Sequence, residues 1–469
     1  MLRAETLNAR GEPLSHQQIA LARAEWHRAL LSKPEVSFPV SSMKTVLRVG
    51  LLTFGLLVAW VAVVVFGTSE GWWKQPIAPR GDSVAFMGAA SRTIDSGQAG
   101  NAVMAVISDG TVQGVHAASV GAAVNADTVF QTASLSKWLT AWGVMALVEQ
   151  GKLDLDAPVS RYLKRWTLPL SAFDNNKVTA RRLLSHTAGL TDGLGYAGFA
   201  PGMPVQSLEA SLTQTADVSP GKKGRVEVGI EPGSEWRYSG GGYAVLQLLI
   251  EDVSGETFEA YMQRVVFRPL GMVHSTFHWS PAQGTTLAAF YGKDAQPAAH
   301  FSFPAVAASS LYTSVSDLTR FLQAHLSGKK GEPVGRGVLA PATVAQMWKP
   351  TGSLYGQAIW GLGTMLYADN GVGGFVVGHD GNNGPALNTA ARLNPATGNG
   401  IVILETGKPL LATRLAGEWV FWEAGRVDFL AFKLALPDML RWLGWGGLAI
   451  VLAVPGIAWG IRRGRRNLA

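Results

Sequence analysis

The chain of 469 residues contains no cysteine. This absence excludes disulfide bonds, a thiol nucleophile and zinc sites built from cysteine thiolates. It is compatible with an oxidising compartment without being evidence for one. The sequence also contains no internal repeats, so the fold must be deduced from individual segments and motifs.

The net charge of +7 is concentrated at one end of the chain. Outside that end, positive and negative residues are close to balanced, so the surplus is not a face for binding nucleic acid. We therefore expect no nucleic-acid partner. The residues that carry the local surplus are Arg462, Arg463, Arg465 and Arg466.

Two long runs, 49–67 and 442–461, contain no charged residue. About 20 apolar residues span a bilayer, so each run is long enough. Lys44 and Arg48 precede the first run and the arginines follow the second, which by the positive-inside rule places both termini in the cytoplasm. We predict a protein of the plasma (inner) membrane with a periplasmic or extracellular domain. The expected aromatic anchors at the outer interface are Trp72, Trp73, Trp442 and Trp445.

The first run also fits a cleaved signal peptide, but no small-x-small cleavage site stands at residues 65–67, and a retained anchor is the prediction. The boundaries follow from these runs and from the motifs described below. The expected segments are a cytoplasmic N-terminal segment with a short amphipathic helix (1–44), transmembrane helix 1 (45–67), a linker (68–84), a catalytic domain (85–428), a juxtamembrane segment (429–441), transmembrane helix 2 (442–461) and a basic cytoplasmic tail (462–469).

Short β-type segments occur near both ends of residues 85–428, with mixed helix and loop from about 155 to 310. Strands at both ends around a helical block predict an α+β fold: an antiparallel sheet flanked by helices, plus an inserted mainly helical domain. A closing helix is expected over Leu410–Ala424. The expected strands are a pair around the Asp109-Gly110 turn within Asn101–Val120, followed by Trp360–Tyr367, Phe375–Gly378, Ala386–Leu393 and Gly400–Leu404.

Ser134 and Lys137 are three residues apart, a spacing that places them on one face of a helix. The following residues 135–148 are apolar on nearly every side, which indicates a helix buried at the centre of a fold, with Gly151 as its C-terminal cap. A serine at the start of such a helix lies beside unpaired N–H groups and the positive end of the helix dipole. Because the lysine amine can take the hydroxyl proton, the pattern predicts an acyl-transfer nucleophile. The alternative is an ordinary helix start, in which a serine and a lysine stand at this spacing by chance.

Several further motifs, by their order and spacing, resemble those of the serine hydrolases related to class C β-lactamases, D,D-peptidases and the esterases built on that fold. The resemblance covers roughly residues 85–425. It implies the β-lactamase/transpeptidase-like fold, an acyl-enzyme on Ser134, and no metal or organic cofactor. The matching stretches are Phe130–Lys137, Gly151–Pro158, Leu183–Leu190, Glu231–Ser239, Pro269–Met272 and Gly378–Gly381.

The resemblance also implies roles for individual residues. The first motif supplies Ser134 and Lys137, and the second supplies Tyr238. Burial lowers the pKa of a lysine and a nearby lysinium lowers that of a tyrosine, so the pair could share one proton near neutral pH, and either could be the base. The third motif brings His379 to a strand beside the nucleophile. The oxyanion hole would consist of the backbone N–H groups of Ser134 and Asn382.

The residues expected to contact substrate are Gly381, Ser239, Gly240 and Trp236. Gly381 would let a substrate backbone come close, and Trp236 would line the site. Two departures from the β-lactamase pattern stand out: the tyrosine motif ends in Gly240 where asparagine is usual, and His379 replaces the usual lysine. Both argue against efficient β-lactam hydrolysis.

Two other histidine positions call for comment. His186 is expected to order its loop by hydrogen bonding and not to take part in chemistry. His274 and His278 have a spacing that would chelate a metal from one helix face, but the residues between them indicate extended chain and no third ligand stands nearby. We therefore predict no metal site.

Together these features predict a membrane-anchored, extracytoplasmic serine hydrolase acting on amides or esters. Its substrates would be D-amino-acid peptides, short esters or envelope precursors, with the lipid bilayer as a partner. Two alternatives stay open: a transacylase of envelope molecules, and a penicillin-binding or sensor protein without turnover. The loops at 190–230 and 280–310, which would shape the pocket, carry no motif that names a substrate, and the sequence does not indicate the oligomeric state.

Overall fold

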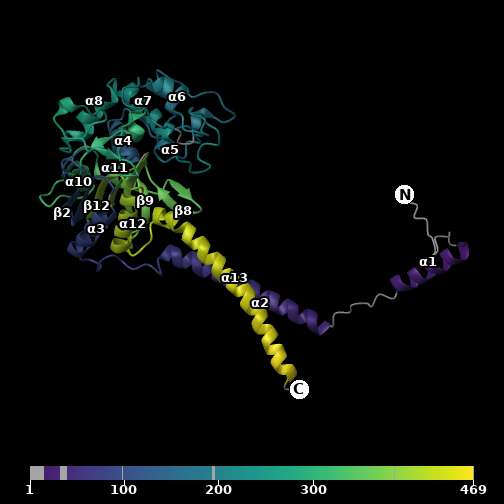
Figure 1. Cartoon of the computed structure of the whole chain (residues 1–469). Helices are drawn as coiled ribbons and strands as arrows, with labels where there is room; N and C mark the ends of the chain where they lie inside the picture. The colour runs from purple at the N-terminus through teal and green to yellow at the C-terminus, as the bar shows by residue number, and fades with distance from the viewer. Residues whose placement is uncertain (1–14, 32–39, 98, 193–195, 385, 468–469) are drawn as a thin grey trace. The chain divides into compact units, whose positions relative to one another are not determined.

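The structure is a computed structural model, and it describes residues 15–31, 40–97, 99–192, 196–384 and 386–467 (Figure 1). The predicted N-terminal segment and basic tail therefore lie partly outside the described residues. The chain divides into two compact units, one of residues 65–439 and one that combines residues 1–64 with residues 440–469.

The unit made from the chain ends is helical. It contains α1 (His16–Leu31), where a short helix is predicted, most of α2 (Val40–Glu70) and the greater part of α13 (Phe429–Asn467). Within the described residues, Met43–Glu70 and Phe429–Ile461 are long and apolar enough to cross a membrane. Trp60 Nε1 donates a hydrogen bond to the Trp442 carbonyl oxygen at 3.2 Å, so the two apolar helices touch within this unit.

An eight-stranded antiparallel sheet organises the other unit, in the order β2-β1-β12-β11-β10-β9-β8-β7. It confirms the predicted sheet made from distant parts of the domain, because Ala102 of β1 pairs with Glu405 of β12. The strands are β1 (Ala102–Ser108), β2 (Thr111–Ala118), β7 (Gly352–Leu354), β8 (Gln357–Trp360), β9 (Met365–Asp369), β10 (Phe375–Asn383), β11 (Leu387–Asn394) and β12 (Asn399–Thr406).

One predicted strand is wrong. Trp360–Tyr367 is not a single strand, because β8 ends at Trp360 and β9 begins at Met365. The chain reverses between them through Gly363, which has φ +73°, and Gly361 N–H donates to the Thr364 carbonyl oxygen at 2.8 Å. Glycine adopts this left-handed backbone at little cost. The pattern of apolar residues around Gly363 gives no sign of the turn, so the sequence analysis predicted one continuous strand.

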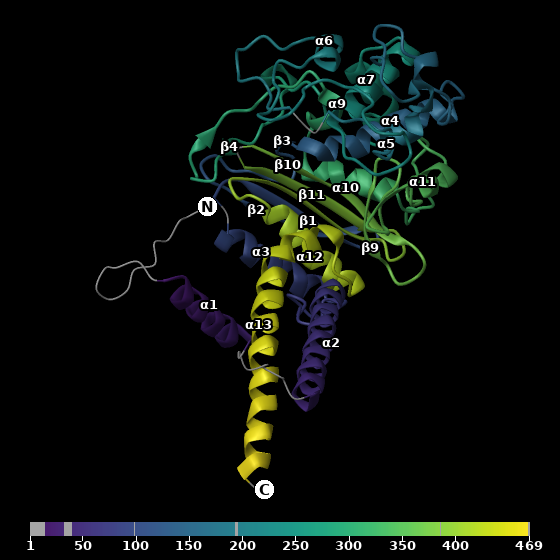
Figure 2. The ribbon, with the colours of Figure 1, turned by 90° about the vertical axis from the view of Figure 1, so that its right-hand side faces the viewer.

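Helices cover both faces of the sheet. In Figure 2, α3 (Ser83–Gly97) and α12 (Leu411–Ala424) lie on one side, and α4 and α10 lie on the other with the inserted helical part beyond them. This arrangement confirms the predicted α+β class. The remaining helices are α4 (Ser136–Glu149), α5 (Ala180–Leu184), α6 (Leu208–Thr213), α7 (Gly240–Ser254), α8 (Phe258–Met262), α9 (Val306–Ser309), α10 (Val315–Ala324) and α11 (Pro341–Met347), with single turns η1 (Ala133–Leu135), η2 (Val159–Arg161), η3 (Asn175–Lys177), η4 (Gln263–Phe267) and η5 (Pro281–Gln283).

Helix α4 runs through the core as the sequence predicts, with residues 136–147 all buried. Its C-terminus closes at Gly151, where φ is +66° and the N–H donates to the Val148 carbonyl oxygen. Lys152 N–H donates to the Leu147 carbonyl oxygen, which completes the cap. A helix fixed along its whole length gives the residues at its N-terminus a rigid support.

Candidate active site

Ser134 lies on η1, between the short strand β3 (Phe130–Gln131) and α4. α4 begins at Ser136, two residues later than the sequence suggests, because Ser134 belongs to a tighter turn that leads into it. Ala133 has φ +49°, a left-handed conformation that is uncommon for a residue with a side chain. This conformation presents Ser134 half-exposed between buried neighbours.

Lys137 is buried next to this serine. Its Nζ donates to Ser134 Oγ at 3.2 Å and to the Ala308 carbonyl oxygen at 2.6 Å, and its side chain is 1% exposed. Burial lowers the pKa of Lys137 to about 7, against an opposing effect of the Asp192 carboxylate. The amine is therefore available in both protonation states near neutral pH.

Tyr238 completes this group from the residues that precede α7. The Lys137 Nζ lies 5.1 Å from the centre of its ring. Burial raises the pKa of the Tyr238 phenol well above its ordinary value, while its hydrogen bond with the Ser134 side chain acts in the opposite direction. The expected lowering of the tyrosine pKa by a neighbouring lysinium is thus wrong in direction, because desolvation of the phenolate dominates.

His379 and Gly381 stand on β10, two residues apart. His379 is buried, its Nδ1 lies 2.7 Å from the Asp380 carbonyl oxygen, and burial together with the charge of Lys137 lowers its pKa to about 3. A Cβ on Gly381 would lie 2.0 Å from the Thr132 carbonyl oxygen, so this glycine is required by the protein's own backbone next to Ser134. Asn382 is exposed at the end of β10, where it pairs with Asn388.

The other predicted contacts lie around Tyr238. The Trp236 and His186 rings are 6.2 Å and 4.2 Å from the Tyr238 ring. His186 orders its loop as predicted, because its Nδ1 accepts the Ser239 N–H at 3.1 Å. Ser239 and Gly240 are buried, and Ser239 Oγ caps α7 by accepting the Gly242 N–H at 2.8 Å. Direct contact of these residues with substrate stays a prediction.

Asp192 is a site residue that the sequence analysis missed. It is 1% exposed, accepts the Gly241 N–H at 2.9 Å and accepts a hydrogen bond from the Ser239 hydroxyl. Asp192 therefore holds the first turn of α7 directly after Tyr238, and its charge acts on Lys137. A single aspartate after the Leu183–Leu190 motif gives no sequence signal of this role, because the contacts come from residues about 50 positions away.

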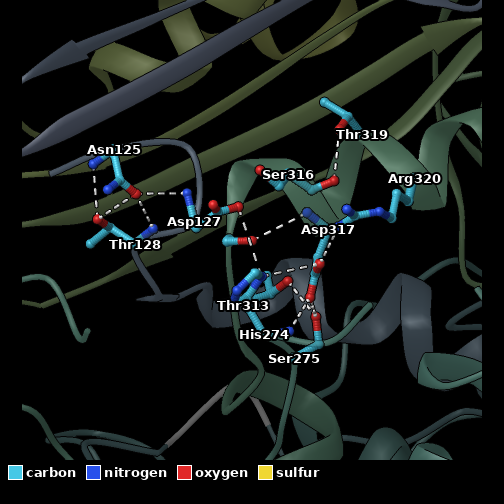
Figure 3. A network of polar contacts seen from close by, with 11 residues as sticks. Asn125, Asp127, Thr128, His274, Ser275, Thr313, Ser316, Asp317, Thr319 and Arg320 are labelled. Atoms are coloured by element: carbon cyan, nitrogen blue, oxygen red, sulfur yellow. Dashed lines mark hydrogen bonds and ion pairs between the residues drawn. The ribbon is translucent and has the colours of Figure 1, made fainter. Parts of the chain in front are cut away.

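His274 belongs to a polar network next to this site (Figure 3). Asp317 accepts hydrogen bonds from the His274 N–H at 2.7 Å and the Ser275 hydroxyl at 2.8 Å, and Ser275 in turn contacts Thr313 Oγ1 at 2.7 Å. Thr313 lies on β6 (Tyr312–Thr313), which pairs with β3 just before Ser134. Among the described residues, no group of three or more histidines and carboxylates is placed to hold a metal ion.

A serine next to a buried lysine, a tyrosine against that lysine and a third motif on the adjoining strand of an antiparallel sheet define a serine hydrolase of the β-lactamase-like fold. Residues 86–425 match the family described as Beta-lactamase. The chain therefore belongs to the beta-lactamase family, whose serine hydrolases include esterases and D-alanine carboxypeptidases.

Curated relatives agree with this assignment. The chain is 29% identical to penicillin-binding protein 4 of Amycolatopsis lactamdurans over 322 residues, which cover 65% of this chain and 80% of that protein. It is 26% identical to the putative penicillin-binding protein PbpX of Bacillus subtilis, over 52% of this chain and 56% of that one. It is 32% identical to esterase EstB of Burkholderia gladioli, over 34% of this chain and 41% of the esterase.

Solved structures show the same fold. The octameric penicillin-binding protein homologue from Pyrococcus abyssi superposes with a TM-score of 0.59 at 22% identity, over 75% of this chain and 80% of that one. SurE superposes with a TM-score of 0.56 at 26% identity, over 72% and 74% of the two chains.

Proposed function

We propose that this protein is a membrane-anchored, extracytoplasmic serine hydrolase that forms an acyl-enzyme on Ser134 with an amide or ester substrate. The observation that carries the proposal is the 3.2 Å contact of Ser134 Oγ with the amine of Lys137, which is buried and has a pKa of about 7. A neutral amine at hydrogen-bonding distance can accept the hydroxyl proton as the oxygen attacks a carbonyl.

The pKa values favour Lys137 over Tyr238 as the base. Burial lowers the pKa of the lysine and raises that of the tyrosine, so at neutral pH the lysine can be neutral and the phenol keeps its proton. In the proposed reaction Lys137 takes the proton of Ser134. The oxyanion of the tetrahedral intermediate accepts hydrogen bonds from the backbone N–H groups of Ser134 and Asn382. Tyr238 remains a hydrogen-bond donor. The leaving group receives the proton from Lys137, and water then cleaves the acyl-enzyme.

The charge of the site favours substrates without a carboxylate at the position of His379. The pKa of about 3 keeps this histidine neutral, so it supplies no positive charge for a carboxylate. Short esters and amides of D-amino acids fit this environment better than β-lactams. The likeness to an esterase supports ester substrates.

Anchoring rests on the two apolar helices, Met43–Glu70 and Phe429–Ile461. The basic residues outside the apolar runs support a topology with both termini in the cytoplasm and the catalytic domain on the outer side of the plasma membrane. In this topology the catalytic domain is tethered to the membrane at both of its ends, which suits substrates that are envelope precursors.

The test is an activity screen of the full chain in detergent against nitrophenyl esters, D-alanyl amides and β-lactams, with intact-mass detection of adducts. We expect turnover of at least one ester or amide, an adduct on Ser134, and neither with Ser134→Ala. An adduct without turnover would favour the sensor alternative, and product only with an added acceptor would favour the transacylase. Equal labelling of wild type and Ser134→Ala would contradict the proposal.

The pH dependence of the reaction is the first prediction. Because the neutral form of Lys137 is the base, kcat/KM should rise with pH through about 7 and level off above it. The measurement is kcat/KM for the best ester between pH 5 and 9, in buffers of constant ionic strength. A rate that is flat through this range would remove Lys137 from the role of base.

A second prediction concerns Asp192. Its negative charge raises the pKa of Lys137, so Asp192→Asn should move the acid limb of the pH profile to lower pH, by about one unit or less. Asp217→Asn is the control, since Asp217 is also a buried loop aspartate but is not among the causes of the Lys137 shift. A shift of the acid limb to higher pH in Asp192→Asn would contradict the prediction that the charge of Asp192 raises the pKa of Lys137.

A further inference from the structure

One arginine and two aspartates form a buried charged cluster beneath the sheet, behind the candidate active site. Arg392 of β11 is completely buried. Its guanidinium donates to Asp428 Oδ2 at 2.7 Å and to both carboxylate oxygens of Asp380 at 3.0 and 3.2 Å. The guanidinium also lies 4.0 Å from the centre of the Tyr367 ring, whose hydroxyl donates to Asp380 Oδ1 at 2.6 Å. Two carboxylates share the one guanidinium, so Arg392 links Asp428 to Asp380.

Asp380 connects this cluster to the third motif. It stands between His379 and Gly381 on β10, and successive side chains of a strand point to opposite faces. Gly381 faces the Thr132 carbonyl oxygen next to Ser134, so Asp380 points to the other face, where Arg392 binds it. The ion pair therefore fixes, from behind, the strand segment that carries His379 and Gly381.

Asp428 brings the start of α13 into the same cluster. Its Oδ1 accepts the Ala431 N–H at 2.6 Å and so caps the helix, while its Oδ2 pairs with Arg392. The next residue, Phe429, stacks on Tyr367 with ring centres 5.8 Å apart. Asp428 lies beyond residue 425, where the family match ends, and directly before a helix that is apolar enough to span a membrane.

We propose that Asp428 is a positioning residue for the active site: through Arg392 and Asp380 it holds the His379–Gly381 segment against the turn that carries Ser134. The start of the second apolar helix, α13, then contributes to the arrangement of the active site as well as to membrane attachment. This inference rests on the proposed function, because its effect is measured on the reactivity of Ser134.

The experiment measures the labelling of Ser134 in the full chain in detergent by a fluorophosphonate probe, as the limiting rate constant and the half-saturating probe concentration. Asp428→Ser removes the charge but keeps a side chain that caps a helix. Asp428→Glu restores the charge. The control is Asp82→Asn, since Asp82 caps α3 through the Ala85 N–H at 2.8 Å but is exposed and outside the cluster.

We expect Asp428→Ser to lower the limiting rate constant about 10-fold to 10²-fold with little change in the half-saturating concentration, because a misplaced active-site segment slows the reaction more than it weakens binding. Asp428→Glu should recover a large part of the rate, and Asp82→Asn should match wild type. Unfolded molecules lower the labelled fraction and not the rate constant, so partial unfolding does not produce the expected result.

A rate constant for Asp428→Ser within twofold of wild type would overturn the inference while leaving the proposed function in place. Equal losses in Asp428→Ser and Asp82→Asn would do the same, since they would show that the effect is not specific to the cluster around Arg392. A wild-type protein that does not label, or that labels equally as Ser134→Ala, would overturn the proposed function and this inference together.

Discussion

Lys137→Met should lower kcat/KM by about 10³-fold, within the range expected for loss of a general base. The methionine occupies a similar volume in the buried site but has no amine to accept the proton of Ser134, whose Oγ lies 3.2 Å from Nζ in the wild type. It also leaves the Ala308 carbonyl oxygen without the 2.6 Å hydrogen bond that it receives from Nζ. The measurement is kcat/KM on the best ester or amide, together with the melting temperature.

Lys137→Arg is the informative partner of this variant. Arginine keeps a positive charge and hydrogen-bond donors, but its pKa is too high for it to act as a base at neutral pH. We expect it to be nearly as inactive as Lys137→Met. If Lys137→Arg keeps more than a tenth of the wild-type activity, the lysine acts through its charge and not by proton transfer, and Tyr238 becomes the better candidate for the base.

Gly381→Ala should damage the active site through a single added methyl group. The new Cβ would lie 2.0 Å from the Thr132 carbonyl oxygen and 2.4 Å from Thr389 Oγ1, and Thr132 stands two residues before Ser134. The Thr132 backbone cannot rotate out of the clash as a flexible side chain can. Strand β10 must therefore move away from the turn that holds the nucleophile. We expect a loss of about 10²-fold in kcat/KM and a destabilisation of about 1–3 kcal/mol.

Gly384→Ala provides the matched control, because a Cβ at that position has nothing within 4 Å and lies in the same β10–β11 hairpin. It should change neither the activity nor the urea midpoint appreciably. Comparable losses in both variants would mean that the hairpin needs glycine for flexibility, and would contradict the role of close backbone packing at Gly381.

The parts of the fold that sequence predicts are those set by local pattern. The apolar run after Ser134 predicted α4, and the Asp109-Gly110 turn predicted the β1–β2 hairpin, because burial on all sides and turn chemistry leave marks on neighbouring residues. The strand predicted over Trp360–Tyr367 failed for the complementary reason. Its glycines reverse the chain, although the apolar residues on either side suggest one continuous strand.

The candidate site likewise contains residues that the sequence predicts and residues that it does not. The motifs indicated Ser134, Lys137, Tyr238 and His379, and the structure places the lysine against the serine and the tyrosine, with its charge acting on the histidine. Asp192, Arg392 and Asp428 could not be found, because a buried charge is defined by partners that are distant in sequence. The direction of the Tyr238 pKa shift was missed for a related reason, since depth of burial is a property of the fold.

The pairing of β1 with β12 sets an order of events during biogenesis. The strand Ala102–Ser108 emerges from the ribosome early, but on one edge its partner is Asn399–Thr406, which is made almost at the end of the chain. The β1–β2 hairpin therefore keeps one strand edge unpaired until nearly the whole domain has been synthesised. Until then the unpaired edge favours aggregation, and truncations before residue 399 should yield aggregates instead of smaller folded proteins.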